Sequence, residues 1–218
     1  MVKTKERKTS IILFTVLALM ILLFCLQAKA SEPTTPHPAD AMWIESDIAE
    51  LPATEGYMFN LTVWINVSEP CYSWQFQIYF NNTYLNATRA GYTAGSKSEF
   101  FQELTTMPVS PIIDNNAGYV LYGESLLGEA QRDPGYGSLA WIEFKVTNAS
   151  ILEQLVGGTS IFEFDPEKSY YMTPTLEYGY PERPSYELVI IPEYSSILML
   201  VMATASIAAI IFVKKKLQ

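Results

Sequence analysis

The chain of 218 residues is acidic, with 23 Asp and Glu against 14 Lys and Arg and a formal net charge of −9. Eight of the basic residues lie in the first 30 or the last five positions, so residues 31–194 carry six basic and 22 acidic side chains, a net charge of −16. This negative charge excludes nucleic acid as a partner, because phosphate binding needs a basic surface.

The N-terminus predicts a secretory signal peptide over residues 1–30. Four basic residues precede the apolar run Ile11–Leu26, which is followed by the small-x-small sequence Ala28-Lys29-Ala30, and this order is typical of a cleaved signal. The apolar run has 16 residues, fewer than the ~20 that a spanning helix needs, and an uncleaved anchor is the alternative. Cleavage leaves Cys71 as the one cysteine, so no internal disulfide is expected.

Residues 31–41 predict a linker, because they contain three prolines and no apolar periodicity. From Met42 onward, short apolar segments and turn signals follow one another. No long amphipathic helix is expected, since Ile151–Leu155 supplies at most one turn. Many short strands at regular spacing indicate an all-β, antiparallel sandwich.

Segment 57–68, YMFNLTVWINVS, predicts a strand with two different faces. Its odd positions are all apolar or aromatic, and a period of two places them in the core. The even, outward positions include Asn60 and Asn66, each an Asn-x-Ser/Thr acceptor that belongs on solvent-exposed surface. The strand is therefore predicted to be buried on one face and glycosylated at Asn60 or Asn66 on the other. Three further acceptors are Asn81, Asn86 and Asn148.

Segment 71–80, CYSWQFQIYF, alternates in the same way. Its even positions from Tyr72 to Phe80 are aromatic or aliphatic and are predicted to face the core. Its outward positions carry no charge and no acceptor: Ser73, Gln75, Gln77 and Tyr79. Later strands are predicted within 112–125, where the Asp-Asn-Asn-Ala-Gly turn separates two of them, and within 134–146, 159–164 and 185–191.

The C-terminal segment predicts a membrane anchor. Residues 195–213 contain no charge and no proline, and three lysines follow at 214–216, which fits a transmembrane helix with a cytosolic tail, 214–218. Residues 31–194 are then expected outside the cell. The membrane-proximal residues 192–194 read Pro-Glu-Tyr, which resembles the Pro-Glu-Phe/Tyr tails of archaeal surface proteins; a plain stalk is the alternative.

The sequence predicts no enzyme, no cofactor and no metal site, although calcium at turns such as those of Asp114 and Asp133 stays open, because carboxylate oxygens are its preferred ligands. The single histidine, His37, lies between two prolines of the linker, and both nucleophilic triads and zinc sites of the nitrogen and sulfur type need a histidine in a structured site. Paired carboxylates for glycoside hydrolysis stay open, but none of the 22 acidic residues is singled out by position.

The order WQFQIYFNNTYLNATRAG (74–91) followed by PGYGSLAWIEFKV (134–146) resembles the cohesin family. The resemblance covers 42–191 and implies a nine-stranded jelly-roll sandwich related to some carbohydrate-binding modules. It departs from the family at Phe80-Asn81, where cohesins commonly carry Asp. The implied function is attachment of an extracellular, dockerin-like protein.

Two other functions stay open beside protein attachment. One is polysaccharide binding or breakdown by a carbohydrate-binding module, in which the outward rings of Trp64 and Trp141 would stack on sugars. The other is a purely structural envelope role. For protein attachment, a cohesin-like arrangement places strands 57–68 and 72–80 in different sheets. Glycans would shield the first sheet, so the partner is predicted to dock on Ser73, Gln75, Gln77 and Tyr79.

Overall fold

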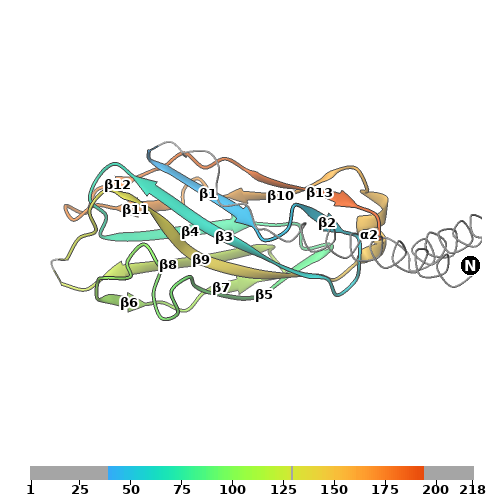
Figure 1. The fold of residues 1–218 in the computed structure, drawn as a ribbon, viewed down its shortest axis with the longest axis horizontal. Coiled ribbons are helices and arrows are strands. Elements are labelled where there is room, and N and C mark those ends of the chain that lie inside the picture. Colours follow the sequence, from blue (N-terminus) through green and yellow to red (C-terminus); the bar gives the residue numbers. More distant parts are fainter. Residues whose placement is uncertain (1–38, 129, 194–218) are drawn as a thin grey trace, which may run out of the picture. The chain divides into compact units, whose positions relative to one another are not determined.

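The structure is a computed structural model that describes residues 39–128 and 130–193. The predicted signal peptide, the linker up to residue 38, the predicted transmembrane helix and the tail lie outside these residues. Within the described ranges, no helix has the length and apolar character needed to cross a membrane. The described residues form two β-sheets that pack against each other (Figure 1).

The smaller sheet has four antiparallel strands and contains the segment with Asn60 and Asn66. Its order is β1 (Ala41–Ser46), β3 (Met58–Val67), β9 (Gly135–Val146) and β5 (Leu85–Tyr92). β1 begins at Ala41, one residue before the predicted start of the domain. The register between β3 and β9 shifts between Val63 and Trp64, so Trp64 lies opposite Ser138 and Leu139 is the extra residue of a β-bulge.

The larger sheet is built around β4 (Ser73–Tyr79). On one side β4 pairs with β8 (Tyr119–Leu126), which also carries the short strands β6 (Thr106–Pro108) and β7 (Ile112–Asp114). On the other side it pairs with both β10 (Thr159–Phe164) and β11 (Tyr170–Met172). The sheet is completed by β12 (Tyr178–Gly179), β13 (Tyr186–Ile191) and β2 (Glu50–Pro52), the last of which runs parallel to β13.

The core between the sheets confirms the predicted alternation. The odd positions of β3 from Phe59 to Val67 are buried, and so are the even positions of segment 71–80 from Trp74 to Phe80. Trp74 and Phe76 stack with ring centroids 5.8 Å apart, and Phe59 stacks on Phe144 at 5.6 Å. Cys71 is a free, buried thiol, and burial raises its pKa to about 12, so it is an unreactive core residue.

The all-β sandwich is therefore as predicted, but its strands are more fragmented. The described residues form thirteen strands where nine were expected. Five of the thirteen have only two or three residues: β2, β6, β7, β11 and β12. The one described helix, α2 (Ala149–Gln154), has six residues, which matches the single turn expected near Ile151. Asn148 caps this helix, its side chain accepting a hydrogen bond from the backbone N–H of Ile151 at 3.2 Å.

Candidate binding faces

The outer face of β4 carries the four residues predicted to bind a partner, and the structure exposes three of them. Tyr79 is 39% exposed, and Ser73 and Gln75 are half-buried. Gln77 is only 1% exposed, which corrects the expectation that it faces solvent. The prediction that this face binds a partner stays a prediction.

Gln77 is buried because segment 165–169, which joins β10 to β11, crosses β4 at this point. The backbone N–H of Gln77 donates to the hydroxyl of Ser169 at 3.1 Å, and its carbonyl accepts from the backbone N–H of Asp165 at 2.8 Å. Its side-chain amide donates to the Asp165 carboxylate at 3.4 Å. Gln77 therefore supports the connection between two strands instead of offering an amide to a partner.

Asp165 organises this crossing and fixes Tyr79. One carboxylate oxygen accepts from the backbone N–H groups of Glu167 and Lys168, at 2.9 and 3.0 Å, and the other accepts from the Tyr79 hydroxyl at 3.0 Å. Burial by itself would raise the pKa of Asp165, but these hydrogen bonds lower it below its ordinary value. The same hydrogen bond raises the pKa of Tyr79. The ring of Tyr79 is thus presented at a fixed position.

Apolar side chains from three neighbouring strands extend the surface around Tyr79. On β8, Tyr119 lies opposite Tyr79, with ring centroids 6.3 Å apart, and Leu121 lies opposite Gln77. Ile112 of β7 pairs with Leu121 and is 53% exposed. Met107 of β6 is equally exposed and pairs with Ser125. We call Tyr79, Tyr119, Leu121, Ile112 and Met107 the Tyr79 patch.

An exposed group of tyrosines lies next to this face. Tyr170 is the β11 partner of Gln75, and its ring meets that of Tyr178 edge-on at 5.0 Å. Tyr178 stacks on Tyr180 at 6.3 Å, and the guanidinium of Arg183 lies 5.9 Å from the Tyr180 ring centroid. These contacts hold the rings at the β11–β12 end of the larger sheet.

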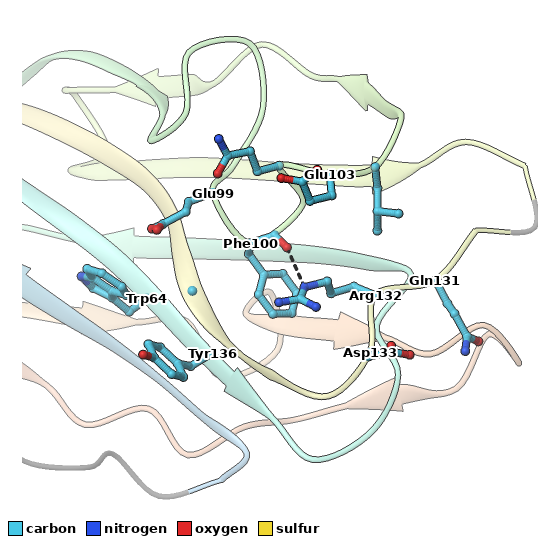
Figure 2. A pocket seen from close by; sticks show the side chains of 11 residues that line it. Trp64, Glu99, Phe100, Glu103, Gln131, Arg132, Asp133 and Tyr136 are labelled. Atoms are coloured by element: carbon cyan, nitrogen blue, oxygen red, sulfur yellow. Dashed lines mark hydrogen bonds between the residues drawn. The ribbon is translucent and has the colours of Figure 1, made fainter.

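The two tryptophans predicted to stack on sugars have different surroundings on the outer face of the smaller sheet. Trp64 lines an open hollow together with Tyr136 and Glu99 (Figure 2). Trp141 lies flat on its own sheet, since a Cβ at Gly91 would come within 2.8 Å of the Trp141 ring, and the guanidinium of Arg89 lies 5.9 Å from its centroid. Both tryptophans are half-buried, but Trp141 is used in packing, whereas part of Trp64 faces the hollow.

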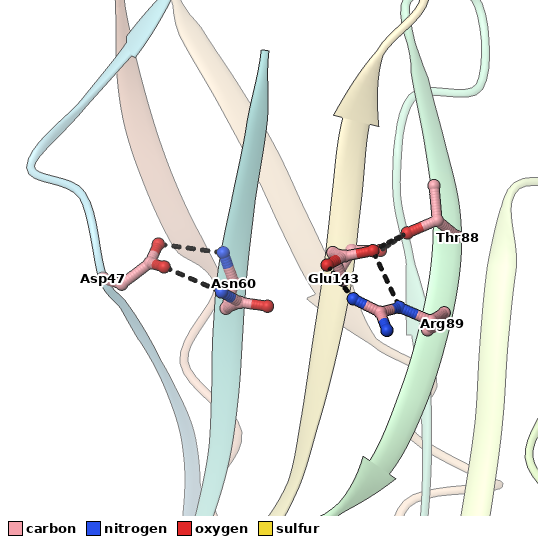
Figure 3. Close-up of polar contacts among 5 residues, drawn as sticks. All are labelled: Asp47, Asn60, Thr88, Arg89 and Glu143. Carbon is pink, nitrogen blue, oxygen red and sulfur yellow. Dashed lines mark hydrogen bonds and ion pairs between the residues drawn. The ribbon is translucent and has the colours of Figure 1, made fainter. Parts of the chain in front are cut away.

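Polar contacts between neighbouring segments also lie on this face (Figure 3). Glu143 accepts from the hydroxyl of Thr88 at 2.5 Å and from the guanidinium of Arg89 at 2.6 Å, and these bonds lower the pKa of Glu143. Asp47 accepts from both the backbone N–H and the side-chain amide of Asn60, at 2.8 and 2.9 Å. The amide nitrogen that would carry a glycan at Asn60 is thus already bonded.

None of the five predicted acceptors lies on a strand of the larger sheet. Asn60 and Asn66 are on β3 and Asn86 is on β5, while Asn81 is exposed in the turn after β4 and Asn148 caps α2. At Asn81, the backbone N–H and hydroxyl of Thr83 both donate to the amide oxygen, at 3.0 and 2.6 Å. Among the described residues, no group of His, Cys, Asp or Glu is arranged to hold a metal ion, and His37 lies outside them.

The sequence did not predict most of the Tyr79 patch or, apart from Trp64, the residues that line the hollow. Ile112, Leu121 and Met107 reach the patch through pairing with β4 and β8, and one strand's own alternation does not show which strands lie beside it. The available signal was the alternation within 119–126, which already indicates an outward Leu121.

Solved structures share this fold. A cohesin module from a Clostridium perfringens family 33 glycoside hydrolase is similar at a TM-score of 0.52 and 12% identity, covering 72% of this chain and all of that one. A type I cohesin–dockerin complex from Clostridium thermocellum is similar at 0.50 and 11%, covering 69% of this chain and 99% of that one. A cohesin of Acetivibrio cellulolyticus scaffoldin B, in complex with a dockerin, is similar at 0.50 and 11%, covering 70% and 99%.

No protein-family model and no curated protein match the sequence. Structural similarity at sequence identities of 11–12% establishes the fold and nothing finer. The described domain is a cohesin-like β-sandwich.

Proposed function

We propose that this chain is a membrane-anchored, cell-surface binding module of the cohesin type, without catalytic activity, that attaches a second protein through the Tyr79 patch. One observation carries the proposal: an uncharged, partly apolar patch lies on the larger sheet of a strongly acidic domain. Interface centres are depleted of charge and enriched in Tyr and Met, because amides and apolar groups cost less to desolvate than carboxylates.

The proposed cell-surface location rests on two predicted segments, one near each end of the sequence. A predicted signal peptide, an uncharged stretch at 195–213 and three lysines after it support export, with the C-terminus in the cytosol. The Pro-Glu-Tyr sequence at 192–194 supports an archaeal type of surface protein. Protease added to intact cells should remove the sandwich, and a protected sandwich would contradict this topology.

The partner that suits the patch has an apolar centre and a basic rim. In the Clostridium thermocellum and Acetivibrio cellulolyticus complexes the bound proteins are dockerins, and a dockerin-like protein is the class we propose here. Glu163, opposite Tyr79, and Asp165 place negative charge beside the patch. The acidic rim of this chain speeds association with a basic partner by electrostatic attraction. The association rate should therefore fall as the salt concentration is raised.

The test compares capture of the same surface protein by matched variants of the full-length chain. Ile112→Asp places a charge within the patch, on strand β7, and should weaken capture about 30-fold or more, as expected when an apolar contact residue becomes charged. Val156→Asp is the control, because Val156 is a similarly exposed aliphatic residue that lies outside the patch, after α2. Equal capture by both variants, or capture of no protein by the unaltered chain, would contradict the proposal.

A further inference from the structure

A second candidate binding surface lies on the smaller sheet, whereas the Tyr79 patch is on the larger one. It is an open hollow of about 530 Å³ beside β3 and the start of β9, and segments 99–104 and 131–133 complete its walls. Small-molecule sites in proteins fall between about 300 and 1,000 Å³. The hollow is therefore large enough for one or two sugar rings.

Two aromatic rings lie side by side at one end of the hollow (Figure 2). Tyr136 is 70% exposed, the largest fraction for any large apolar or aromatic side chain among the described residues. Trp64 is held in place by Trp43, which is buried and stacks on it with centroids 6.2 Å apart and planes 11° from parallel. A supported indole beside an exposed phenol offers flat apolar faces at little cost in side-chain entropy.

Polar groups of both hydrogen-bonding types line the rest of the hollow (Figure 2). Glu99 is fixed by the hydroxyl of Ser138, and its backbone N–H donates to the hydroxyl of Thr93 at 3.0 Å. Arg132 donates from Nε to the carbonyl of Phe100 at 3.0 Å, and its guanidinium lies 5.5 Å from the Phe100 ring centroid. In the described part of the chain, hydrogen bonds engage Nε of Arg132 and leave its two terminal nitrogens as donors. The remaining polar lining residues are Gln102, Glu103, Gln131 and Asp133.

The charges in the hollow select against anionic ligands, because an anion would meet the three carboxylates of Glu99, Glu103 and Asp133 against the one guanidinium of Arg132. A cation is the competing ligand, and choline is the probe for it. A neutral ligand whose hydroxyl groups both donate and accept fits carboxylates, amides and a guanidinium together. A ring with apolar C–H faces fits Trp64 and Tyr136.

We propose that this hollow is a saccharide-binding site, in which a pyranose ring stacks on Tyr136 and Trp64 while its hydroxyls bond to Glu99 and Arg132. The sugar has two sources. Asn66 is the direct cross-strand partner of Tyr136, so a glycan attached to Asn66 would begin beside the hollow. A free saccharide would enter from solvent and use the same groups.

The test uses full-length protein in a detergent without a sugar headgroup, with cellobiose, maltose and N,N′-diacetylchitobiose as probes in saturation-transfer NMR and calorimetry. The Asn66→Gln protein is titrated beside the native protein, so that an attached glycan cannot fill the hollow. Binding of at least one probe is expected. Binding by both proteins identifies a free saccharide as the ligand, and binding by Asn66→Gln alone identifies the chain's own glycan.

Matched variants in the Asn66→Gln background locate the site. Tyr136→Ala should weaken probe binding about tenfold, and Tyr136→Phe, which keeps the ring, should leave it within about twofold. Tyr178→Ala removes another exposed ring, which lies outside the hollow, and should change nothing. The proposal is overturned if neither protein binds any probe, if Tyr136→Ala binds as well as Tyr136→Phe, or if choline binds where the sugars do not.

Discussion

The outer faces of the two sheets differ in how they are made. On the smaller sheet, side chains of adjacent strands satisfy one another, as in Glu143 with Arg89 and Trp141 with Gly91, and three acceptor asparagines project between them. On the larger sheet, the Tyr79 patch has no acceptor and contains exposed apolar side chains. Where side chains already pair with each other, as around Glu143, a face gains little from a protein partner, whereas an apolar patch gains from being covered.

A substitution in the core between the two sheets should lower the stability of the domain more than any other change considered. Phe76→Ala should lower the free energy of unfolding by about 3–5 kcal/mol, because Phe76 is fully buried and stacked on Trp74. Urea denaturation followed by fluorescence measures it. Tyr79→Phe on the same strand keeps the ring and should change stability far less. An unchanged midpoint for Phe76→Ala would mean that the inward set of β4 is wrong.

A smaller effect concerns segment 165–169, which is bonded to β4 at Gln77. Asp165→Ala should cost about 1 kcal/mol at neutral pH, since it removes hydrogen bonds to Tyr79 and two backbone N–H groups at a partly solvated site. The folded-state pKa of Asp165 lies below the ordinary value of 3.8. Its stabilisation is therefore complete above 3.8 and is lost as the pH falls through the folded-state pKa.

Denaturation of both proteins across pH 2–7 (about 1 unit per step) checks this assignment. The stability gap between the native chain and Asp165→Ala should close only at the acidic end. A gap that stays constant down to the lowest pH would show that the carboxylate charge does not hold segment 165–169.

The smallest expected effect concerns glycans on the smaller sheet. Asp47→Ala frees the amide of Asn60 and should raise the fraction of Asn60 that is glycosylated relative to Asn86, which serves as the internal reference. Glycopeptide mass spectrometry of protein from its native cells measures both fractions. Five bare acceptors would remove the proposed shielding of this face, and an unchanged Asn60 fraction would show that the bond to Asp47 does not limit modification.

Alternation along each strand could be predicted from the sequence, whereas contacts between distant segments could not. Alternation placed Phe59 to Val67 and Trp74 to Phe80 in the core, because burial on one side of a strand imposes a period of two that is written in consecutive residues. It failed at Gln77, which is covered by Asp165 and Ser169, about ninety positions later in the chain. It also could not show that Trp141 lies on Gly91, since strand neighbours and bulges are set by tertiary pairing.

We propose that the larger sheet, and not the smaller one, binds the protein partner, and oxidative footprinting of the full-length chain with and without its captured partner distinguishes the two sheets. Hydroxyl radicals modify exposed Tyr, Met and aliphatic side chains, and the two faces offer matched reporters: Tyr79, Met107 and Ile112 on one, Tyr136 and Met58 on the other. We expect the partner to protect the first three and to leave Tyr136 and Met58 as reactive as in the free chain. Protection of Tyr136 and Met58 with an unprotected Tyr79 patch would contradict it.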